Sequence, residues 1–396
     1  MAMDIARARA ETPSCAKVAH FNNAGAALMP QAVLDAQIDH LRLEGEMGGY
    51  EAAAAAADKI AGTYTAVAKL LNCATEEVAL VENATVAWNQ AFHAFDFQPG
   101  HRILTAEAEY AANYIACLKV ARDRGVAVEV VPSDESGQLS VSALEAMIDD
   151  KVKLISVTHV PTNGGLVNPA PEIGRVARAA GIPFLLDACQ SAGQLPLDVE
   201  ALGCDLLSVT GRKYLRGPRG SGFLYVRKAM LERLEPPMPD LHAAAWVARD
   251  RYELRPDARR FENWEFNTAA VIGLGTAVDY ALGWGLEAIE DRVVKLAHHL
   301  RLRLEEELGL PVYDLGRRKC GIVTTALPGI EAAEVRRRLG AQAINSSHST
   351  PDSTRIDAEK RRLPDLLRLS VHYYNSEEEI DRLIQALREV LREVKG

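Results

Sequence analysis

The chain has 396 residues, of which 48% are hydrophobic, and its formal net charge is -9. This length suffices for a large buried core and for two or three domain-sized units. Because Lys and Arg are interleaved with a larger number of Asp and Glu, the composition argues against a partner among the nucleic acids. The N-terminal residues contain no apolar run long enough for a secretory signal or a membrane span, so we expect a cytoplasmic protein with no membrane partner.

Six widely spaced cysteines never form a C-x-x-C pair. This spacing disfavours a zinc site and a thioredoxin-like redox motif. We expect reduced, mostly buried thiols and no bound metal.

The elements follow one another in a recognisable order. After an N-terminal segment, residues 1–30, few helix breakers interrupt the stretch from Pro30 to Leu71, which predicts helical structure. Short apolar runs then alternate with amphipathic stretches up to Val226, which is the pattern of a doubly wound α/β sheet with both faces buried. The seven predicted strands are Val78–Val81, Arg102–Thr105, Ala127–Val131, Leu154–Thr158, Phe184–Asp187, Leu206–Thr210 and Gly222–Val226.

The remaining third of the chain is less regular. A Pro-rich passage and the aromatic, charged stretch from Trp246 to Trp264 predict a surface connection or a lid. A small C-terminal α+β domain is then predicted from helices at Thr268–Leu282, Leu286–Leu308 and Ser376–Val394 and from a strand at Gly321–Ala326. We therefore expect a large domain over residues 31–275 and a small domain over residues 276–396, against which the N-terminal segment packs.

Polar residues follow three of the predicted strands, and ligands of open α/β sheets bind at the carboxyl ends of strands. Glu82 to Thr85 leads into a helix, where backbone N–H groups and the Thr85 hydroxyl could bind a phosphate, although Thr85 could equally be a helix cap. Asp187 ends a wholly apolar strand and could pair with a protonated pyridine nitrogen. Aspartate at a strand end is also common in metal, nucleotide and sugar enzymes.

The third cluster runs from Ser208 to Gly222 and contains Lys213. A lysine on a short loop between two apolar strands, with Thr210 and Arg212 beside it, suits a Schiff base, because desolvation and nearby cations lower its pKa. The alternative is a basic, glycine-rich hairpin that faces solvent.

Together these motifs resemble the cofactor core of the class V aminotransferase and cysteine desulfurase group of fold-type I enzymes that use pyridoxal 5′-phosphate (PLP). The resemblance rests on Asp187-x-x-Gln190, on Thr210-Gly211-Arg212-Lys213 and on the following Gly-Pro-x-Gly-x-Gly run, and it extends from Phe21 to the Arg368-Leu369-Ser370 region. The group includes cysteine desulfurases, isopenicillin N epimerase-like proteins and hercynylcysteine sulfoxide lyases. It implies a large PLP-binding domain with a mainly parallel seven-stranded sheet and a small C-terminal α+β domain.

The resemblance also implies roles for matching residues. Lys213 would hold PLP as a Schiff base and move the Cα proton of the substrate, while Asp187 would bind the pyridine nitrogen and Tyr110 would stack on the ring. Arg368 would bind the substrate α-carboxylate. The remaining cofactor contacts would be Gln190 and Thr162, or its neighbour Asn163, at the ring hydroxyl, and Ala84, Thr85, Thr210 and Arg212 at the phosphate. Thr268 would reach the phosphate of a partner subunit, which implies a homodimer with shared active sites.

The stretch between residues 345 and 363 contains no cysteine, whereas a desulfurase needs a mobile thiolate there. The segment Glu44–Glu51, with Tyr50, resembles hercynylcysteine sulfoxide lyases. We therefore expect C–S β-elimination on an S-substituted cysteine or cysteine sulfoxide, with Asn23, Tyr50 and His348 near the substrate. The alternatives are an aminotransferase or an amino-acid epimerase. An inactive binding module is disfavoured because Lys213 and Asp187 are both present.

Overall fold

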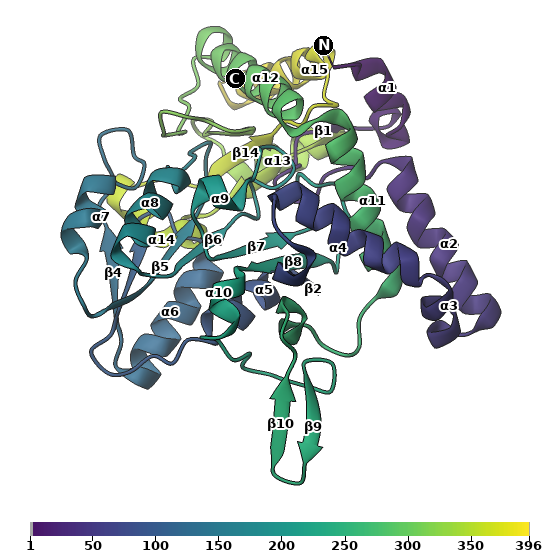
Figure 1. The fold of residues 1–396 in the computed structure, drawn as a ribbon. Helices are drawn as coiled ribbons and strands as arrows, with labels where there is room; N and C mark the ends of the chain where they lie inside the picture. The colour runs from purple at the N-terminus through teal and green to yellow at the C-terminus, as the bar shows by residue number, and fades with distance from the viewer. Residues whose placement is uncertain (1–2, 396) are drawn as a thin grey trace.

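The computed structural model describes residues 3–395, and its large domain is built on a seven-stranded sheet (Figure 1). The strand order is β2-β8-β7-β6-β5-β3-β4, in which β3 to β7 are mutually parallel and β8 runs antiparallel to both β2 and β7. The sheet is thus mainly parallel, as predicted. Its strands are β2 (Val78–Val81), β3 (Arg102–Ala106), β4 (Ala127–Val131), β5 (Val152–Thr158), β6 (Phe184–Asp187), β7 (Leu206–Thr210) and β8 (Gly222–Val226).

Both faces of this sheet are buried, because alternate side chains of each strand point to opposite sides. Leu185 and Leu206 pack with Trp88 and Phe92 on one side. Leu186 belongs to the core on the other side. This two-sided burial explains why the central strands are continuously apolar rather than alternating.

Helices cover the two faces. One side carries α5 (Ala84–Phe92) and α6 (Ala111–Arg124), whose apolar residues join the first core cluster. Several helices end at glycines in the left-handed conformation, such as Gly125 with φ 66° and Gly181 with φ 67°. The remaining helices of the large domain are α2 (Gln31–Met47), α3 (Gly49–Ala55), α4 (Ala57–Leu71), α7 (Val141–Met147), α8 (Ala170–Ala180), α9 (Val199–Leu202) and α10 (Lys228–Leu231).

The helical stretch predicted from Pro30 to Leu71 consists of three helices rather than one. The break between α2 and α3 falls at Gly48, whose φ of 97° no α-helix can contain. A second break at Ala56 separates α3 from α4. Helices α2 and α4 pack beside α11 (Thr268–Trp284), which is continuous across the predicted domain boundary at residue 275. The boundary itself stays a prediction.

The aromatic stretch that begins at Trp246 contains a β-hairpin, which the sequence did not predict. Strands β9 (Ala244–Ala248) and β10 (Arg251–Leu254) pair antiparallel and project from the body of the molecule (Figure 1). Trp246 is 80% exposed and Tyr252 is 48% exposed. The hairpin buries little of its own surface, so hydrophobic periodicity could not reveal it.

The C-terminal part is the expected α+β unit. Strands β11 (Ile322–Thr325), β14 (Leu366–Ser370) and β13 (Ser347–Ser349) form an antiparallel sheet, which α12 (Leu286–Leu308), α13 (Ala332–Ala341) and α15 (Glu377–Lys395) accompany. The N-terminal strand β1 (Ala19–His20) pairs parallel with β12 (Ile344–Asn345). Helix α1 (Ile5–Ala10) lies against the C-terminal part, because Arg9 Nη1 donates to Glu379 Oε1 at 2.8 Å (Figure 1).

Among residues 3–395, no single helix is long and apolar enough to cross a membrane. Helices α11 and α12 pass the criterion only as a pair, and this pair is bent by 79°. Most residues of α11 are buried inside the protein.

Candidate active site

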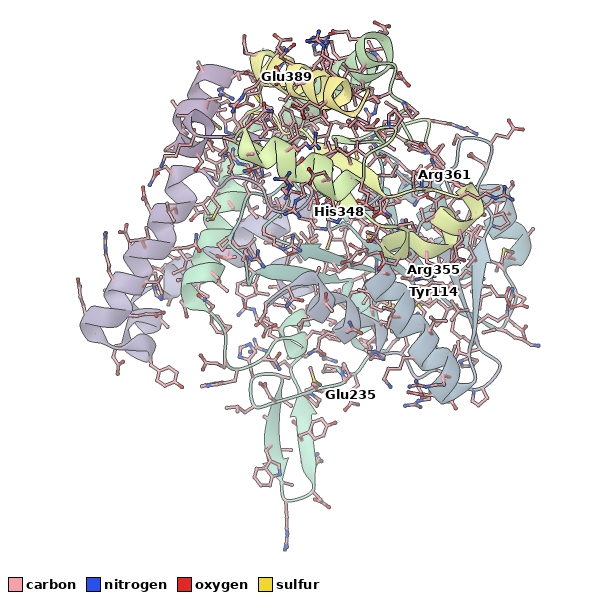
Figure 2. The ribbon with its side chains drawn as sticks, turned by 180° about the vertical axis from the view of Figure 1, so that it is seen from behind. Tyr114, Glu235, His348, Arg355, Arg361 and Glu389 are labelled. Atoms are coloured by element: carbon pink, nitrogen blue, oxygen red, sulfur yellow. The ribbon has the colours of Figure 1, made fainter. Side chains whose placement is uncertain are left out.

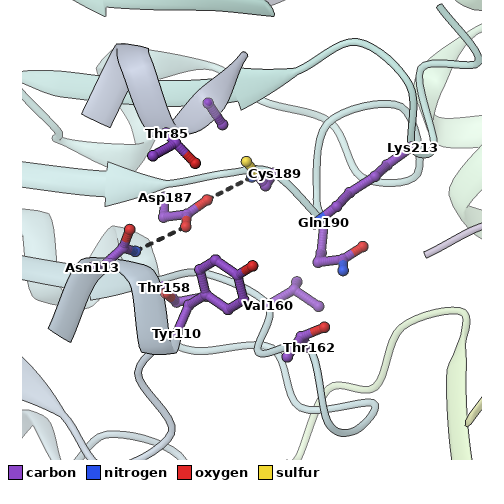
Figure 3. A pocket seen from close by; sticks show the side chains of 11 residues that line it. Thr85, Tyr110, Asn113, Thr158, Val160, Thr162, Asp187, Cys189, Gln190 and Lys213 are labelled. Carbon is purple, nitrogen blue, oxygen red and sulfur yellow. Dashed lines mark hydrogen bonds between the residues drawn. The ribbon is translucent and has the colours of Figure 1, made fainter. Parts of the chain in front are cut away.

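A pocket lies at the carboxyl ends of β5 and β6, next to the loop between β7 and β8 and the N-terminus of α5 (Figure 3). The strand register brings this about, because Thr158 at the end of β5 pairs with Asp187 at the end of β6, and Asp187 pairs with Ser208 of β7. The pocket is lined by Ala84, Thr85, Tyr110, Asn113, Thr158, Val160, Thr162, Asp187, Cys189, Gln190 and Lys213.

Asp187 is 5% exposed and is held from two sides. Its Oδ1 accepts a hydrogen bond from the backbone N–H of Cys189 at 2.9 Å, and its Oδ2 accepts one from Asn113 Nδ2, also at 2.9 Å (Figure 3). Each carboxylate oxygen has two lone pairs, so capacity remains for a donor in the pocket.

Lys213 reaches the same pocket from the β7–β8 loop (Figure 3). Burial lowers the pKa of its ammonium group, and the positive charges of Arg212 and Arg368 lower it further, although the negative charge of Asp187 opposes the shift. No hydrogen bond or ion pair to another described residue holds its Nζ. A lysine in these surroundings deprotonates readily and can act as a nucleophile.

The lining residues fit PLP, because polar groups in the pocket have no hydrogen-bond partner among the described residues and could bind the cofactor. The side-chain oxygen of Gln190 is buried without a hydrogen-bond partner, while its Nε2 donates to the Ala24 carbonyl at 3.1 Å. A ring hydroxyl could supply the missing donor. Thr85 lies in the first turn of α5, which Asn83 caps, so N–H groups of a helix N-terminus face the pocket where a phosphate would bind.

Tyr110 precedes α6 and places its ring in the pocket (Figure 3). It is 39% exposed, so one face of the ring is available for stacking. Thr162 also lines the pocket. Its neighbour Asn163 does not, because Asn163 Nδ2 donates to the Thr350 carbonyl and to Thr354 Oγ1.

Arg368 lies on β14 at the border between the two domains and is 9% exposed. Its Nη1 donates to Thr162 Oγ1 at 2.6 Å and to the Thr162 carbonyl at 3.2 Å, while Nη2 is 3.5 Å from Ser347 Oγ. Its Nε is buried without a partner, and burial lowers the pKa of the guanidinium. Among the described residues it forms no ion pair, so an anionic ligand would give it its first counter-charge.

The segment between residues 345 and 363 is folded against the large domain. It contains β13 and α14 (Arg355–Arg361), and the backbone N–H of Asp357 donates to the Glu107 carbonyl at 3.2 Å. Lys360 forms an ion pair of 2.6 Å with Glu107 (helix α14 carries the Arg355 and Arg361 labels in Figure 2). This segment contains no cysteine, and its Ser347 Oγ lies 3.5 Å from Arg368 Nη2.

Three residues expected at the phosphate do not line the pocket of their own chain. Arg212 donates through Nη1 to the Gly25 carbonyl. Thr210 is the last residue of β7 and pairs with Gly222. Thr268 is the first residue of α11 and is 8% exposed. Their contacts with the cofactor stay predictions, and the structure gives Arg212 a different partner.

Asn23, Tyr50 and His348, which were expected near the substrate, do not line this pocket, and neither does Arg368. Their contacts with the substrate stay predictions. Asn23 is fully buried, and its amide donates to the carbonyls of His20 and Ser370, so it serves packing. Tyr50 is 74% exposed on α3.

The strand register places His348 on the other face of β13 from Ser347. Ser347 pairs with Arg368 and His348 pairs with Leu367, which belongs to the hydrophobic core. Because neighbouring residues on a strand point to opposite faces, Ser347 rather than His348 shares the face of Arg368.

The sequence interpretation missed four lining residues: Asn113, Thr158, Val160 and Cys189. Asn113 lies four residues after Glu109, close to Tyr110. Cys189 lies two residues after Asp187, between the two predicted cofactor contacts Asp187 and Gln190. Asn113 could have been found from its spacing, because residues four apart at the start of a helix, such as Glu109 and Asn113, lie on the same face.

A lysine of lowered pKa beside a strand-end carboxylate, at the edge of a seven-stranded sheet that a smaller C-terminal domain closes, is the arrangement of fold-type I PLP-dependent enzymes. The chain is an enzyme of that class, with PLP as its cofactor. More narrowly, it belongs to the family described as Aminotransferase class-V, whose sequence profile matches residues 19–383.

Relatives with assigned names support this placement. A cysteine desulfurase of Serratia proteamaculans is 32% identical over 409 residues, which cover 98% of this chain and 99% of the relative. A probable cysteine desulfurase of Methanothermobacter thermautotrophicus is 30% identical over 352 residues, 88% of this chain and 87% of the relative. The apo structure of a cysteine desulfurase from Thermococcus onnurineus superimposes with a TM-score of 0.91 at 27% identity, covering 99% of both chains.

Proposed function

We propose that this enzyme catalyses C–S β-elimination from an S-substituted cysteine or a cysteine sulfoxide. The Cα–H bond and the Cβ–S bond break, sulfur leaves with the electron pair of the C–S bond, and the remaining aminoacrylate hydrolyses to pyruvate and ammonia. A hercynylcysteine sulfoxide is the substrate favoured by the resemblance of Glu44–Glu51 to hercynylcysteine sulfoxide lyases. Because Tyr50 is exposed and does not line the pocket of its own chain, it could contact the substrate only in the site of a partner subunit.

One observation carries the choice of elimination over desulfuration through a protein persulfide. Where a desulfurase needs a thiolate, the described segment beside Arg368 presents the hydroxyl of Ser347. Cys189 is the one cysteine lining the pocket as described, and it lies beside Asp187, where burial raises the pKa of its thiol far above the usual range. Cys320 is fully buried, and burial raises the pKa of its thiol to about 12.

In this proposal Lys213 holds the cofactor and then moves the substrate Cα proton, for which its lowered pKa suits it. PLP withdraws electrons from Cα when bound. Asp187 keeps the cofactor ring nitrogen protonated. Arg368 binds the substrate carboxylate with donors that Thr162 and Ser347 orient, and Gln190 and Tyr110 hold the ring.

We further propose a homodimer in which Thr268 of one subunit approaches the phosphate bound by the other. Two features support this. Thr268 lies outside the pocket of its own chain, and Tyr50 is exposed on α3, where a second subunit could cover it. Sedimentation of the PLP-loaded protein tests the dimer, and a monomer at all concentrations would contradict it.

The decisive assay mixes the PLP-loaded protein with S-substituted cysteines and cysteine sulfoxides and measures pyruvate and ammonia without an added keto acid. We expect stoichiometric pyruvate release from the wild-type protein and none from Lys213→Ala. Amino-group transfer to a keto acid would instead indicate an aminotransferase, and racemisation at Cα without pyruvate would indicate an epimerase. Either result would refute the lyase proposal.

A further inference from the structure

A second carboxylate, that of Glu109, lies behind Asp187 and lines no part of the pocket. It follows β3, immediately before α6, and is 4% exposed. Its oxygens accept hydrogen bonds from the N–H of Tyr110 at 2.9 Å, from Asn113 Nδ2 at 3.0 Å and from the N–H of Thr158 at 3.1 Å. The hydroxyls of Thr105 and Thr158 also donate to it.

These contacts favour the ionised form of Glu109. Burial raises the pKa of this carboxyl group and the negative charge of Asp187 raises it further, while the hydrogen bonds from Thr158, Asn113 and the Tyr110 N–H oppose the rise. N–H groups can only donate, and each carboxylate oxygen receives at least one of them. Among these groups, a proton on Glu109 could be accepted only by the hydroxyl of Thr105 or Thr158, because the three N–H groups can only donate. The structure thus surrounds a buried negative charge with the groups that stabilise it.

Asn113 joins this charge to Asp187. It lies one helical turn after Glu109, is 5% exposed, and its Nδ2 donates one hydrogen to Glu109 Oε1 at 3.0 Å and the other to Asp187 Oδ2 at 2.9 Å. If the amide were flipped, its carbonyl oxygen would face both carboxylates. The charge on Glu109 therefore fixes the orientation of the Asn113 amide, and this amide fixes one oxygen of Asp187.

We propose that Glu109 is a positioning residue that acts through Asn113 to hold Asp187 in place and so keeps a proton on the pyridine nitrogen of the cofactor. The inference rests on the proposed placement of Asp187 at that nitrogen. Two physical effects support it. A correctly oriented Asp187 makes the charge-assisted hydrogen bond, and a second buried negative charge nearby stabilises the positive charge of the protonated ring. Glu109 itself touches neither cofactor nor substrate.

The test uses Glu109→Gln, which keeps the shape and removes the charge. PLP labelled with 15N at the ring nitrogen is bound to the protein without substrate, and the 15N chemical shift reports whether that nitrogen is protonated. We expect a protonated nitrogen in the wild-type protein and a shift toward the neutral ring in Glu109→Gln. In the lyase assay the same variant should lose roughly tenfold or more in kcat with little change in KM, because the ring charge acts in the chemical step.

Glu107→Gln is the matched control. Glu107 lies two residues away and binds Lys360 and Ser133 rather than Asn113, so its substitution should leave the 15N shift unchanged. If Glu109 acts through Asp187, the double variant with Asp187→Asn should shift no further than Asp187→Asn alone. A shift in Asp187→Asn with none in Glu109→Gln would overturn this inference and leave the placement of Asp187 intact.

If neither variant shifts the signal, the placement of Asp187 at the ring nitrogen is wrong, and the inference fails with it. Should Glu109→Gln not fold, Asn113→Leu removes the bridge while four other donors to Glu109 remain. It should produce the same shift toward the neutral ring, and an unchanged shift would equally overturn the inference.

Discussion

Replacing Arg368 tests the proposed binding of the substrate carboxylate beside the pocket-lining Thr162. In the structure its guanidinium is almost buried, donates to Thr162 and Ser347, and has no carboxylate partner among the described residues. Truncating one partner of a buried charge pair costs about 2–5 kcal/mol. Arg368→Ala should therefore lower kcat/KM by roughly 30-fold to several thousand-fold, since 1.36 kcal/mol corresponds to a factor of ten.

The assay compares an S-substituted cysteine with its α-amide, which lacks the carboxylate charge. The large loss in Arg368→Ala should appear with the acid and should nearly vanish with the amide. Thr162→Val is the graded companion: it removes the 2.6 Å hydrogen bond that orients Arg368, so we expect a loss of about 0.5–1.5 kcal/mol, a few-fold, with the acid. Equal losses with acid and amide, or no loss with either, would refute the assignment of Arg368 to the carboxylate.

Four further substitutions test the cofactor lysine, the loop that carries it and the stability of the fold. Lys213→Ala should abolish both pyruvate release and the visible absorbance of the bound cofactor while the thermal unfolding of the apo protein changes little; retained turnover would contradict the role. Gly193→Ala should destabilise the protein and displace the lysine loop, because Gly193 has φ 90° and a Cβ there would lie 2.3 Å from the backbone of the residue after Lys213. Gly62→Ala, on α4 with open space around it, should instead stabilise by up to about 1 kcal/mol, and urea unfolding of the two variants provides the comparison. Asp314→Asn should cost about 3–5 kcal/mol in the free energy of unfolding, because Arg301 then keeps a buried charge without its 2.7 Å partner; a cost under 1 kcal/mol in urea unfolding would contradict this.

The amino-acid sequence alone determined the sheet and its chemistry. Continuous apolar runs such as Phe184–Asp187 can be buried only on both faces of a sheet, and a polar residue that ends such a run must lie at the sheet edge. The seven strands were therefore predictable, whereas the class of enzyme and the cofactor were predicted from the resemblance of the motifs around Asp187 and Lys213 to a known family. Lys213 and Gln190 were identifiable because the motifs that contain them are local in sequence.

Tertiary structure alone decided which side chains face one another. The pairing of β13 with β14 turned Ser347 toward Arg368 and His348 toward the core, and no sequence pattern fixes the register of so short a strand. Asn23 was expected near the substrate, and in the structure its side chain is buried and donates to the carbonyl of Ser370 in the C-terminal part. Asn113, which connects Glu109 to Asp187, lies 74 residues before Asp187 in the sequence. Local sequence specifies which residue types can do the chemistry, whereas long-range packing decides which of them meet, because each contact depends on elements that fold against one another only in the assembled domain.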